Sequence, residues 1–158
     1  MRDPRIEHGR GCGYNQLIMP KTPVPPELEE FLAQPNPSVI GTTDPDGSPH
    51  TAATWYLWED GRVLVNMADT RKRLDHMRSE PRVSLTAIAK DNFYLQVTLR
   101  GRVVEIADDD DLSGIDRLSK QYMGQPYGRH GQKRVNAWIE VESWYGWSGG
   151  RYWAGEKS

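Results

Sequence analysis

A cluster of cationic side chains follows a threonine near the middle of the chain. The cluster consists of Thr70, Arg71, Lys72 and Arg73. It stands in the first turn of a helix predicted over residues 70–79, where each cation opposes the helix dipole at a cost of about 0.3–1 kcal/mol. Backbone amides at a helix N-terminus, a hydroxyl group and two or three cations together suit the binding of phosphate. The alternative is that these cations pair with Asp69 or Asp75, or face water.

A second predicted helix carries the opposite charge at its start. Asp108 to Asp111 place carboxylates where the dipole of a helix predicted over residues 108–123 is positive. Such a run is typical of a solvated helix N-terminus and requires no ligand. The contrast singles out residues 70–73 as a candidate phosphate site. Nucleotides and flavins are phosphorylated ligands that could lie along the strand before it.

Hydrophobic periodicity and turn residues predict mainly β-structure around these helices. Apolar and β-branched residues alternate with polar residues in segments of strand length. The predicted strands are 38–43, 50–58, 62–67, 82–89, 93–106 and 135–147, and a first helix follows Pro25-Pro26 and ends before Pro35. The apolar phase changes after Gly101, which predicts a bulge or sharp bend in a curved strand. The pattern indicates an antiparallel β-barrel with a helix over one end.

Length and charge exclude several classes of protein. The 158 residues fit one domain, predicted over 25–150 between a flexible N-terminal arm (1–24) and a short C-terminal tail (151–158). Twenty basic and 22 acidic residues give a net charge of −2, so we expect neither nucleic acid nor a membrane as partner. The single Cys12 cannot form an internal disulfide. With no secretory leader or apolar span, the expected location is the cytoplasm.

The aromatic residues have an unusual composition. There are 6 Trp and 7 Tyr against 2 Phe. Trp and Tyr combine an apolar ring with a polar edge, which suits half-buried surfaces such as cofactor pockets and subunit interfaces.

The cationic cluster lies in a longer segment that resembles a known family. Residues 61–85, GRVLVNMADTRKRLDHMRSEPRVSL, resemble the pyridoxamine 5'-phosphate oxidase-like split-barrel superfamily, in which a Ser/Thr-Arg-Lys step holds a flavin phosphate. Residues 40–58, IGTTDPDGSPHTAATWYLW, look like its first hairpin, and residues 95–106, LQVTLRGRVVEI, look like a later strand. The resemblance implies a mainly β (α+β) fold. It is a six-to-seven-stranded antiparallel split β-barrel of the FMN-binding type, with flanking helices.

The resemblance also implies which residues bind the cofactor. They are Ala52, Ala53, Thr54, Asn66, Thr70, Arg71, Lys72, Gln96 and Trp147. The true oxidases carry Arg and Lys where this chain has Ala52 and Leu57, and only Trp147 to Gly150 remains of their late substrate-binding motif. Oxidation of pyridoxamine phosphate is therefore not expected. The chain is more similar to the flavin/deazaflavin oxidoreductases that use coenzyme F420.

Three functions remain open on this resemblance. The first is hydride transfer from reduced F420 to a conjugated or unsaturated small molecule, in a homodimer with the cofactor at the subunit interface. The second is an FMN-dependent reductase or oxidase. The third is a non-catalytic protein that binds flavin, deazaflavin or haem.

No catalytic side chain is implied, because the cofactor carries the chemistry and no nucleophile is required. Candidate proton donors are Tyr56, Tyr145 and His50, although packing or capping explains each of them as well. The spacing of the histidines indicates no metal site.

Overall fold

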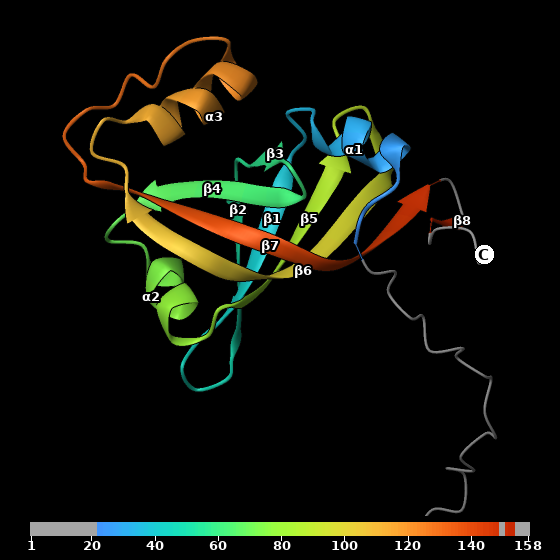
Figure 1. Ribbon diagram of the computed structural model, residues 1–158, viewed down its shortest axis with the longest axis horizontal. Coiled ribbons are helices and arrows are strands. Elements are labelled where there is room, and N and C mark those ends of the chain that lie inside the picture. Colours follow the sequence, from blue (N-terminus) through green and yellow to red (C-terminus); the bar gives the residue numbers. More distant parts are fainter. Residues whose placement is uncertain (1–21, 149–150, 154–158) are drawn as a thin grey trace, which may run out of the picture.

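One antiparallel sheet forms most of the molecule (Figure 1). The computed structural model describes residues 22–148 and 151–153. The strands are β1 (Ser38–Thr43), β2 (Pro49–Thr54), β3 (Leu57–Glu59), β4 (Arg62–Ala68), β5 (Arg82–Ala89), β6 (Asn92–Asp108), β7 (Arg134–Ser148) and β8 (Arg151–Trp153). Their order is β2-β1-β5-β6-β7-β4-β3, with β8 paired to β7. The sheet curls without closing, which confirms the predicted antiparallel split barrel.

The barrel is open between β2 and β4. Among the described strands, β2 pairs with β1 alone, and β4 pairs with β7 along its length but with β3 only over residues 62–64. One edge of β2 and the later part of one edge of β4 are therefore unpaired. The side chain of Arg73 donates hydrogen bonds to both edges. Because unpaired edges expose backbone N–H and C=O groups, the split is a polar slot in the barrel wall.

Alternating apolar residues fill the barrel with one core. The core includes Val63, Val65, Met67, Val83, Leu85, Ala87, Val97, Leu99, Val135, Ala137, Ile139 and Val141. The register between β6 and β7 shifts at Gly101. A Cβ atom on Gly101 would lie 2.1 Å from the Glu140 carbonyl oxygen, so the chains can approach this closely only at glycine. The predicted irregularity after Gly101 is confirmed.

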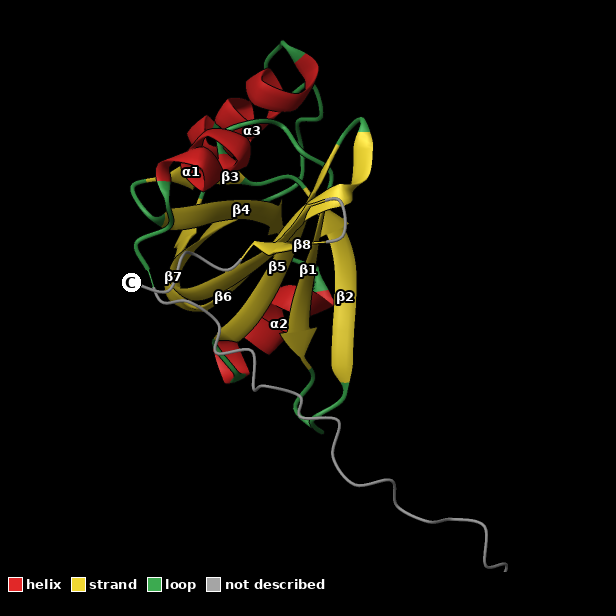
Figure 2. Ribbon diagram, turned by 90° about the vertical axis from the view of Figure 1, so that its right-hand side faces the viewer, coloured by secondary structure: helices red, strands yellow, loops and turns green. Residues whose placement is uncertain are grey.

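Helices cover both ends of the barrel. They are α1 (Pro26–Leu32), α2 (Lys72–Ser79) and α3 (Ser113–Met123). Figures 1 and 2 show α2 at one end and both α1 and α3 at the other. The third helix begins at Ser113, not at residue 108 as predicted, because Asp108 still pairs with Val135 at the end of β6. Within the described residues, no helix combines the length and apolarity needed to cross a membrane.

The described residues refine the ends of the domain. Val24, which the predicted boundary assigns to the N-terminal arm, is 6% exposed and packs in the core. The domain therefore includes Val24, and the predicted arm over residues 1–21 lies outside the described residues. Of the predicted tail, residues 151–153 form β8 on β7. Residues 154–158 are outside the described part.

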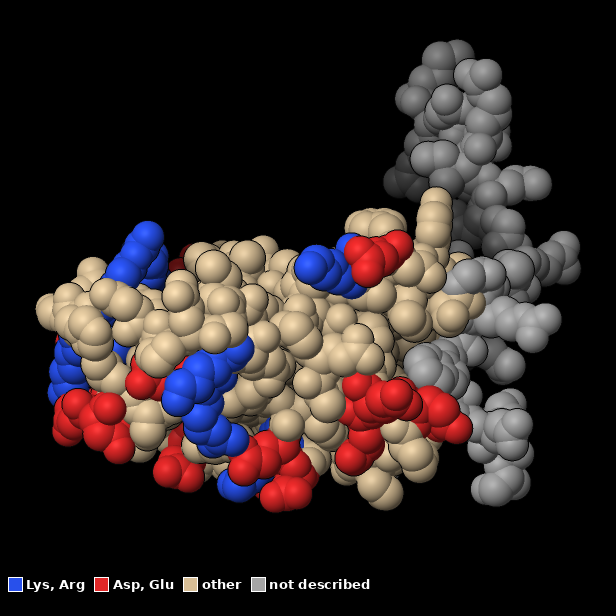
Figure 3. All heavy atoms as spheres, turned by 90° about the horizontal axis from the view of Figure 1, so that it is seen from above, with Lys and Arg blue, Asp and Glu red and all other residues tan. Residues whose placement is uncertain are grey.

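Charges of both signs are mixed on the surface. In the view of Figure 3, Lys and Arg side chains lie beside Asp and Glu side chains and form no continuous basic field. Ion pairs on the surface of the protein include that of Lys133 with Asp108 at 2.7 Å. This face therefore has no extended basic surface of the kind that nucleic acid requires.

Candidate cofactor site

The N-terminus of α2 and the adjoining part of β2 enclose a pocket of about 500 Å³, here called the anion cradle. It is lined by His50, Thr51, Ala52, Ala53, Thr70, Arg71, Lys72 and Arg73. The Arg71 amide donates to the Ala68 carbonyl oxygen at 3.1 Å. The next two amides, of Lys72 and Arg73, are in the first helical turn and have no intrahelical acceptor. Free amides and cationic side chains together favour an anion here.

No ion pair with a described carboxylate neutralises Arg71 or Lys72. Asp75, the candidate partner on α2, pairs with Arg78 at 3.7 Å instead. Both cationic side chains are exposed. The alternative in which Asp69 or Asp75 pairs with these cations is therefore wrong, and both side chains are available to a ligand.

Arg73 differs from its neighbours because it is half-buried across the split. Its guanidinium donates to the carbonyl oxygens of Ala53 in β2 and Asn66 in β4, each at 3.4 Å. Its buried Nε has no hydrogen-bond partner among the described atoms. Burial lowers the pKa of Arg73, and the charges of Arg71 and Arg134 lower it further. Since arginine remains protonated in proteins, this unneutralised charge is directed at the split.

A second pocket, of about 630 Å³, continues from the anion cradle along the split and is called the split pocket. It shares Ala53 and Arg73 with the cradle and is also lined by Pro35, Pro37, Ser38, Thr54, Trp55, Asn66, Lys90, Ile115, Leu118, Tyr122, Tyr127 and Arg134. Trp55 stacks on Tyr122, with ring centroids 5.3 Å apart and an interplanar angle of 13°. The flat aromatic wall and the adjoining cradle suit a planar ring that carries a phosphate group.

Arg134 reaches the split pocket from the start of β7 and is positioned by a buried polar network. Its Nε donates to Asn66 Oδ1 at 2.8 Å. Asn66 Nδ2 donates to Asp109 Oδ2 at 2.9 Å and to Asn136 Oδ1 at 2.8 Å. The guanidinium of Arg134 also lies over the Tyr127 ring, 5.1 Å from its centroid. The side-chain amide of Asn66 is thus fully used in holding its neighbours.

Asp109 corrects the prediction of a solvated acidic run. Its side chain is 2% exposed and accepts hydrogen bonds from the amides of Gly114 and Ile115, each at 2.9 Å. It therefore satisfies amides at the N-terminus of α3 from inside the protein. A Cβ atom on Gly114 would lie 2.1 Å from Asn136 Oδ1, so glycine allows α3 to approach the network. Asp110 and Asp111 are exposed, as predicted.

A split barrel with a cation-rich helix N-terminus at its open edge agrees with the comparison to known families. The family model described as Pyridoxamine 5'-phosphate oxidase matches residues 24–148. The chain belongs to this family. It therefore has the fold of a flavin-type oxidoreductase family, as the resemblance implied. No curated protein matches the chain.

Solved structures support the same fold. An F420 reductase has 24% sequence identity and a TM-score of 0.70, covering 77% of this chain and 98% of its own. A conserved hypothetical protein from Mycobacterium tuberculosis has 23% identity and a TM-score of 0.65, covering 81% and 86%. HupZ from Group A Streptococcus has 17% identity and a TM-score of 0.59, covering 82% and 98%. At these identities the similarity concerns the fold.

Most of the residues that the family resemblance predicts lie at the two pockets. Ala52, Thr70, Arg71 and Lys72 line the anion cradle, Thr54 and Asn66 line the split pocket, and Ala53 lines both. Because the Asn66 side chain is engaged, its backbone carbonyl is the group that meets Arg73 in the split. The prediction missed Arg134, which is 68 residues from Asn66. No local pattern marks Arg134, since its position depends on residues distant in the sequence.

The two remaining predicted cofactor-binding residues, Gln96 and Trp147, line neither the anion cradle nor the split pocket. They are directly opposite each other on β6 and β7, and β6 is three strands from β2 in the sheet order. The alternation along paired strands places both residues on the outer face of the sheet, together with Val39 and Ala53. Neither residue lines the split pocket of the same chain.

The candidate proton donors occupy three different environments. Tyr56 is fully buried and lines neither pocket, and its hydroxyl lies 3.4 Å from the Gln34 carbonyl oxygen that it donates to. Burial raises the pKa of Tyr56. His50 lines the anion cradle and contacts His76 edge to face at 5.2 Å. Tyr145 is partly exposed on the outer face of the sheet. Of the three, only His50 borders the site.

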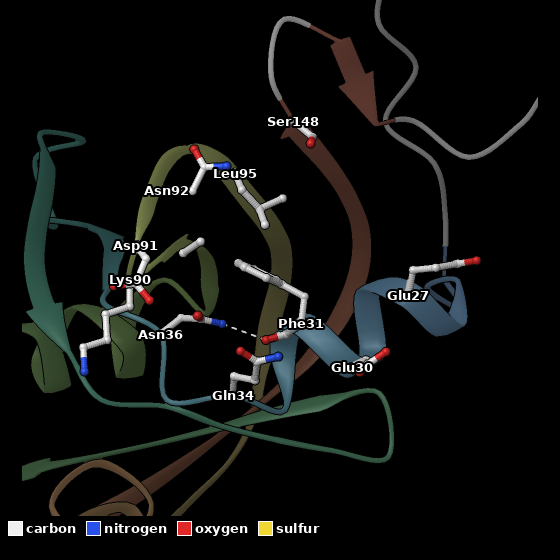
Figure 4. Close-up of a pocket in the computed structure, with 11 residues that line it drawn as sticks. Glu27, Glu30, Phe31, Gln34, Asn36, Lys90, Asp91, Asn92, Leu95 and Ser148 are labelled. Atoms are coloured by element: carbon white, nitrogen blue, oxygen red, sulfur yellow. Dashed lines mark hydrogen bonds between the residues drawn. The ribbon is translucent and has the colours of Figure 1, made fainter.

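A third cavity, of about 650 Å³, lies between α1 and the turn from β5 to β6 (Figure 4). It is lined by Glu27, Glu30, Phe31, Gln34, Asn36, Ala89, Lys90, Asp91, Asn92, Leu95 and Ser148. Figure 4 shows Phe31 and Leu95 facing its interior, with Glu27 and Glu30 on α1. Three carboxylates against one lysine disfavour a phosphorylated ligand, so this cavity does not share the chemistry of the anion cradle.

Proposed function

We propose that this protein is an oxidoreductase that uses reduced coenzyme F420 to reduce a conjugated or unsaturated small molecule. The main support is the anion cradle. Its cations lack an acidic partner among the described residues, and it shares Ala53 and Arg73 with the split pocket. The fold shared with an F420 reductase supports the deazaflavin. FMN also carries a phosphate and a planar ring, so an FMN-dependent reductase or oxidase of the same fold is the alternative.

The residues present fit such a cofactor. Arg71 and Lys72 would bind its phosphate, with the free amides at the start of α2 as further donors. The small side chains of Ala52 and Ala53 would allow a ring to approach the backbone of β2. Unpaired N–H and C=O groups at the split can pair with amide-like ring edges, and the orphaned Nε of Arg73 is a further donor there.

The protein's part in the reaction is binding, orientation and exclusion of water. When bound, a deazaflavin supplies the hydride. Arg73 joins the two strand edges that flank the ring site, so it fixes the width of the split. The stacked Trp55 and Tyr122 close the opposite wall. His50 is the described candidate that borders the cradle and could hold a proton near it.

We also propose a homodimer through the outer face of the sheet. Uncharged side chains occupy this face over neighbouring strands: Val39, Gly41, Thr51, Ala53, Ser84, Thr86, Ile88, Gln96, Thr98, Tyr145 and Trp147. Val39 and Tyr145 are each 37% exposed. By the same alternation, Arg82 and Arg100 lie at one end of this face, beside Ser84. The uncharged patch beyond them suits pairing with a second copy. Such a dimer would give Gln96 and Trp147 of one copy access to the cofactor of the other.

A parallel titration of the purified protein with F420 and FMN tests the proposed function. We expect F420 to bind more tightly than FMN and to quench tryptophan fluorescence, because Trp55 lies in the split pocket. The double substitution Arg71→Ala and Lys72→Ala should abolish measurable binding, whereas Arg78→Ala, at the other end of α2, should not. Tighter binding of FMN would favour the alternative cofactor.

Turnover separates an enzyme from a cofactor-binding protein. Quinones, enones and nitroaromatic compounds are added as candidate substrates to the protein with bound reduced F420. Oxidation of F420 is then followed by its absorbance. Tight binding without oxidation by any member of this panel would support a non-catalytic role in binding flavin, deazaflavin or haem. Unchanged F420 binding in the double variant would show that the cradle is not the phosphate site.

A further inference from the structure

The guanidinium of Arg134 is a second cationic point in the split pocket, on the side of α3. Only its Nε is used in a hydrogen bond within the described chain, to Asn66. The stacking contact with Tyr127 occupies the face of the guanidinium and leaves the terminal nitrogens, which donate in its plane, without an acceptor. Two parallel donors in one plane match the geometry of a carboxylate.

Asp109 acts on Arg134 through its charge but makes no direct ion pair with it among the described residues. Asp109 is already the acceptor for the amides of Gly114 and Ile115 and for Asn66 Nδ2. Burial lowers the pKa of Arg134, and the charge of Arg71 lowers it further, against opposing effects of Tyr127 and Asp109. The network therefore fixes a half-buried cation at some cost to stability. Titratable groups whose pKa is shifted by burial and neighbouring charges are frequent at functional sites.

Apolar and aromatic groups surround this cation. Ile115 and Leu118 of α3 line the same pocket, as do the stacked rings of Trp55 and Tyr122. A ligand bound here would thus meet a flat aromatic wall, an aliphatic surface and the planar cation of Arg134. Arg73 and Lys90 also line the pocket, so substitution of Arg134 is needed to assign the carboxylate to it. The anion cradle offers a different set of groups, exposed cations and helix amides, which suits a phosphate and not a flat apolar acid.

We propose that the α3 side of the split pocket binds a flat, conjugated carboxylate, with its carboxylate on the terminal nitrogens of Arg134. The π system would lie against Trp55 and Tyr122. The identification of this molecule as the compound that is reduced rests on the proposed function. The binding site itself does not, because it is formed by residues of the α3 side that need no cofactor.

Calorimetric titration of the cofactor-free protein with trans-cinnamate and trans-cinnamamide tests this site. The two probes share the same flat conjugated skeleton and differ in the anionic group. We expect cinnamate to bind at least about tenfold more tightly than the amide, as a charge-assisted pair with arginine implies. Equal affinities, or no binding of cinnamate at millimolar concentration, would overturn the proposal without any variant.

Two arginine substitutions localise the effect. Arg134→Gln should reduce cinnamate affinity about tenfold or more and leave cinnamamide affinity unchanged. Arg117→Gln is the matched control, since Arg117 is also an arginine on this side but pairs with Glu59 outside the pocket. Circular dichroism shows whether Arg134→Gln is folded. If it is not, Arg134→Lys keeps the charge but loses the planar fork and should retain part of the preference.

Competition distinguishes this site from the anion cradle. Inorganic phosphate should not displace cinnamate, because the two anions occupy different parts of the site. Displacement by phosphate, or loss of cinnamate binding in the Arg71→Ala and Lys72→Ala variant with Arg134 intact, would show that the acid binds the cradle and would overturn the proposal. F420 binding is measured separately, so either proposal can fail while the other stands.

Discussion

The N-termini of α2 and α3 border the same split pocket. The charges placed at these two positive dipole ends have opposite signs. At α3, buried Asp109 accepts hydrogen bonds from the amides of Gly114 and Ile115. At α2, the cap residue is Arg71, whose side chain makes no capping hydrogen bond and is followed by two further cations. One helix end is satisfied inside the protein. The other gains positive charge from its own side chains and lacks an internal acceptor.

The difference separates scaffold from ligand site. A buried carboxylate that satisfies a helix end is part of the fold, whereas a cationic helix end favours an anion from solution. Both helix starts carry a run of like charges, but Asp109 is buried and Arg71 is exposed. We therefore expect substitutions at α3 to change the free energy of unfolding and substitutions at α2 to change ligand affinity.

The largest expected effect is at Asp109. Asp109→Ala should lower the free energy of unfolding by about 3–5 kcal/mol, because it leaves buried donors of Asn66, Gly114 and Ile115 without their acceptor. Urea denaturation measures this loss. Asp110→Ala removes a neighbouring carboxylate that is exposed, and should change the stability by no more than about 0.5 kcal/mol. Equal losses in the two variants would mean that general charge, and not burial, distinguishes the α3 end.

The next largest effect is expected when the N-terminus of α2 is given a capping carboxylate, as the N-terminus of α3 has. Arg71→Asp replaces the exposed cap cation with a capping carboxylate. Affinity for the phosphorylated cofactor should fall about 100-fold, and the free energy of unfolding should rise by about 0.5–1 kcal/mol. Fluorescence titration and urea denaturation give the two values. Arg78→Gln, near the other end of α2, should leave affinity unchanged, and a comparable loss there would contradict a localised anion site.

A smaller loss of stability is expected at the contact between α3 and the polar network. Gly114→Ala should cost about 1–3 kcal/mol, because the new Cβ atom would collide with the Asn136 side chain. Gly128→Ala is the matched control, since no atom lies within 4 Å of its Cβ position and its φ is outside the left-handed region. Thermal denaturation of both variants measures the difference. If Gly114→Ala is as stable as Gly128→Ala, close packing of α3 is not required.

The smallest effect concerns Tyr122, in the wall of the split pocket. Its hydroxyl donates to the Asn36 carbonyl oxygen at 2.8 Å, so Tyr122→Phe should cost about 1 kcal/mol. Burial raises the pKa of Tyr122 to about 12. Because the folded pKa lies above the ordinary value, its contribution to stability is complete below about pH 10 and is lost as pH rises through about 12.

Absorbance at alkaline pH checks this pKa. Wild type and Tyr122→Phe should show the same tyrosinate absorbance between about pH 9 and 11, because Tyr122 stays protonated there. If the variant lacked part of the wild-type tyrosinate signal in this range, Tyr122 would be more accessible to solvent than its contact from α3 to residue 36 implies.

Most elements with strong local signals were predicted well. The strand predicted over 50–58 is instead interrupted between β2 and β3, and β8 was not predicted. The strands, the helix after Asp69 and the irregularity at Gly101 depend on alternation, turn residues and one missing Cβ atom, all of which can be read in a short window. The start of the helix at residue 108 was wrong for a physical reason. A run of acids satisfies the preference of a helix N-terminus, but pairing of Asp108 with Val135 extends β6 through this position.

Without the family resemblance, local patterns predicted the site only where neighbours in sequence are also neighbours in space. The amino-acid sequence by itself determined that cations begin α2 after a strand, and hence that an anion is favoured there. Tertiary structure alone decided which charges stay unpaired: it buries Asp109 against α3, directs Arg134 through Asn66 and leaves the edges of β2 and β4 apart. The reason is that helix dipoles and alternation act over a few residues, whereas neutralisation of a charge depends on whichever groups the fold brings within hydrogen-bond distance.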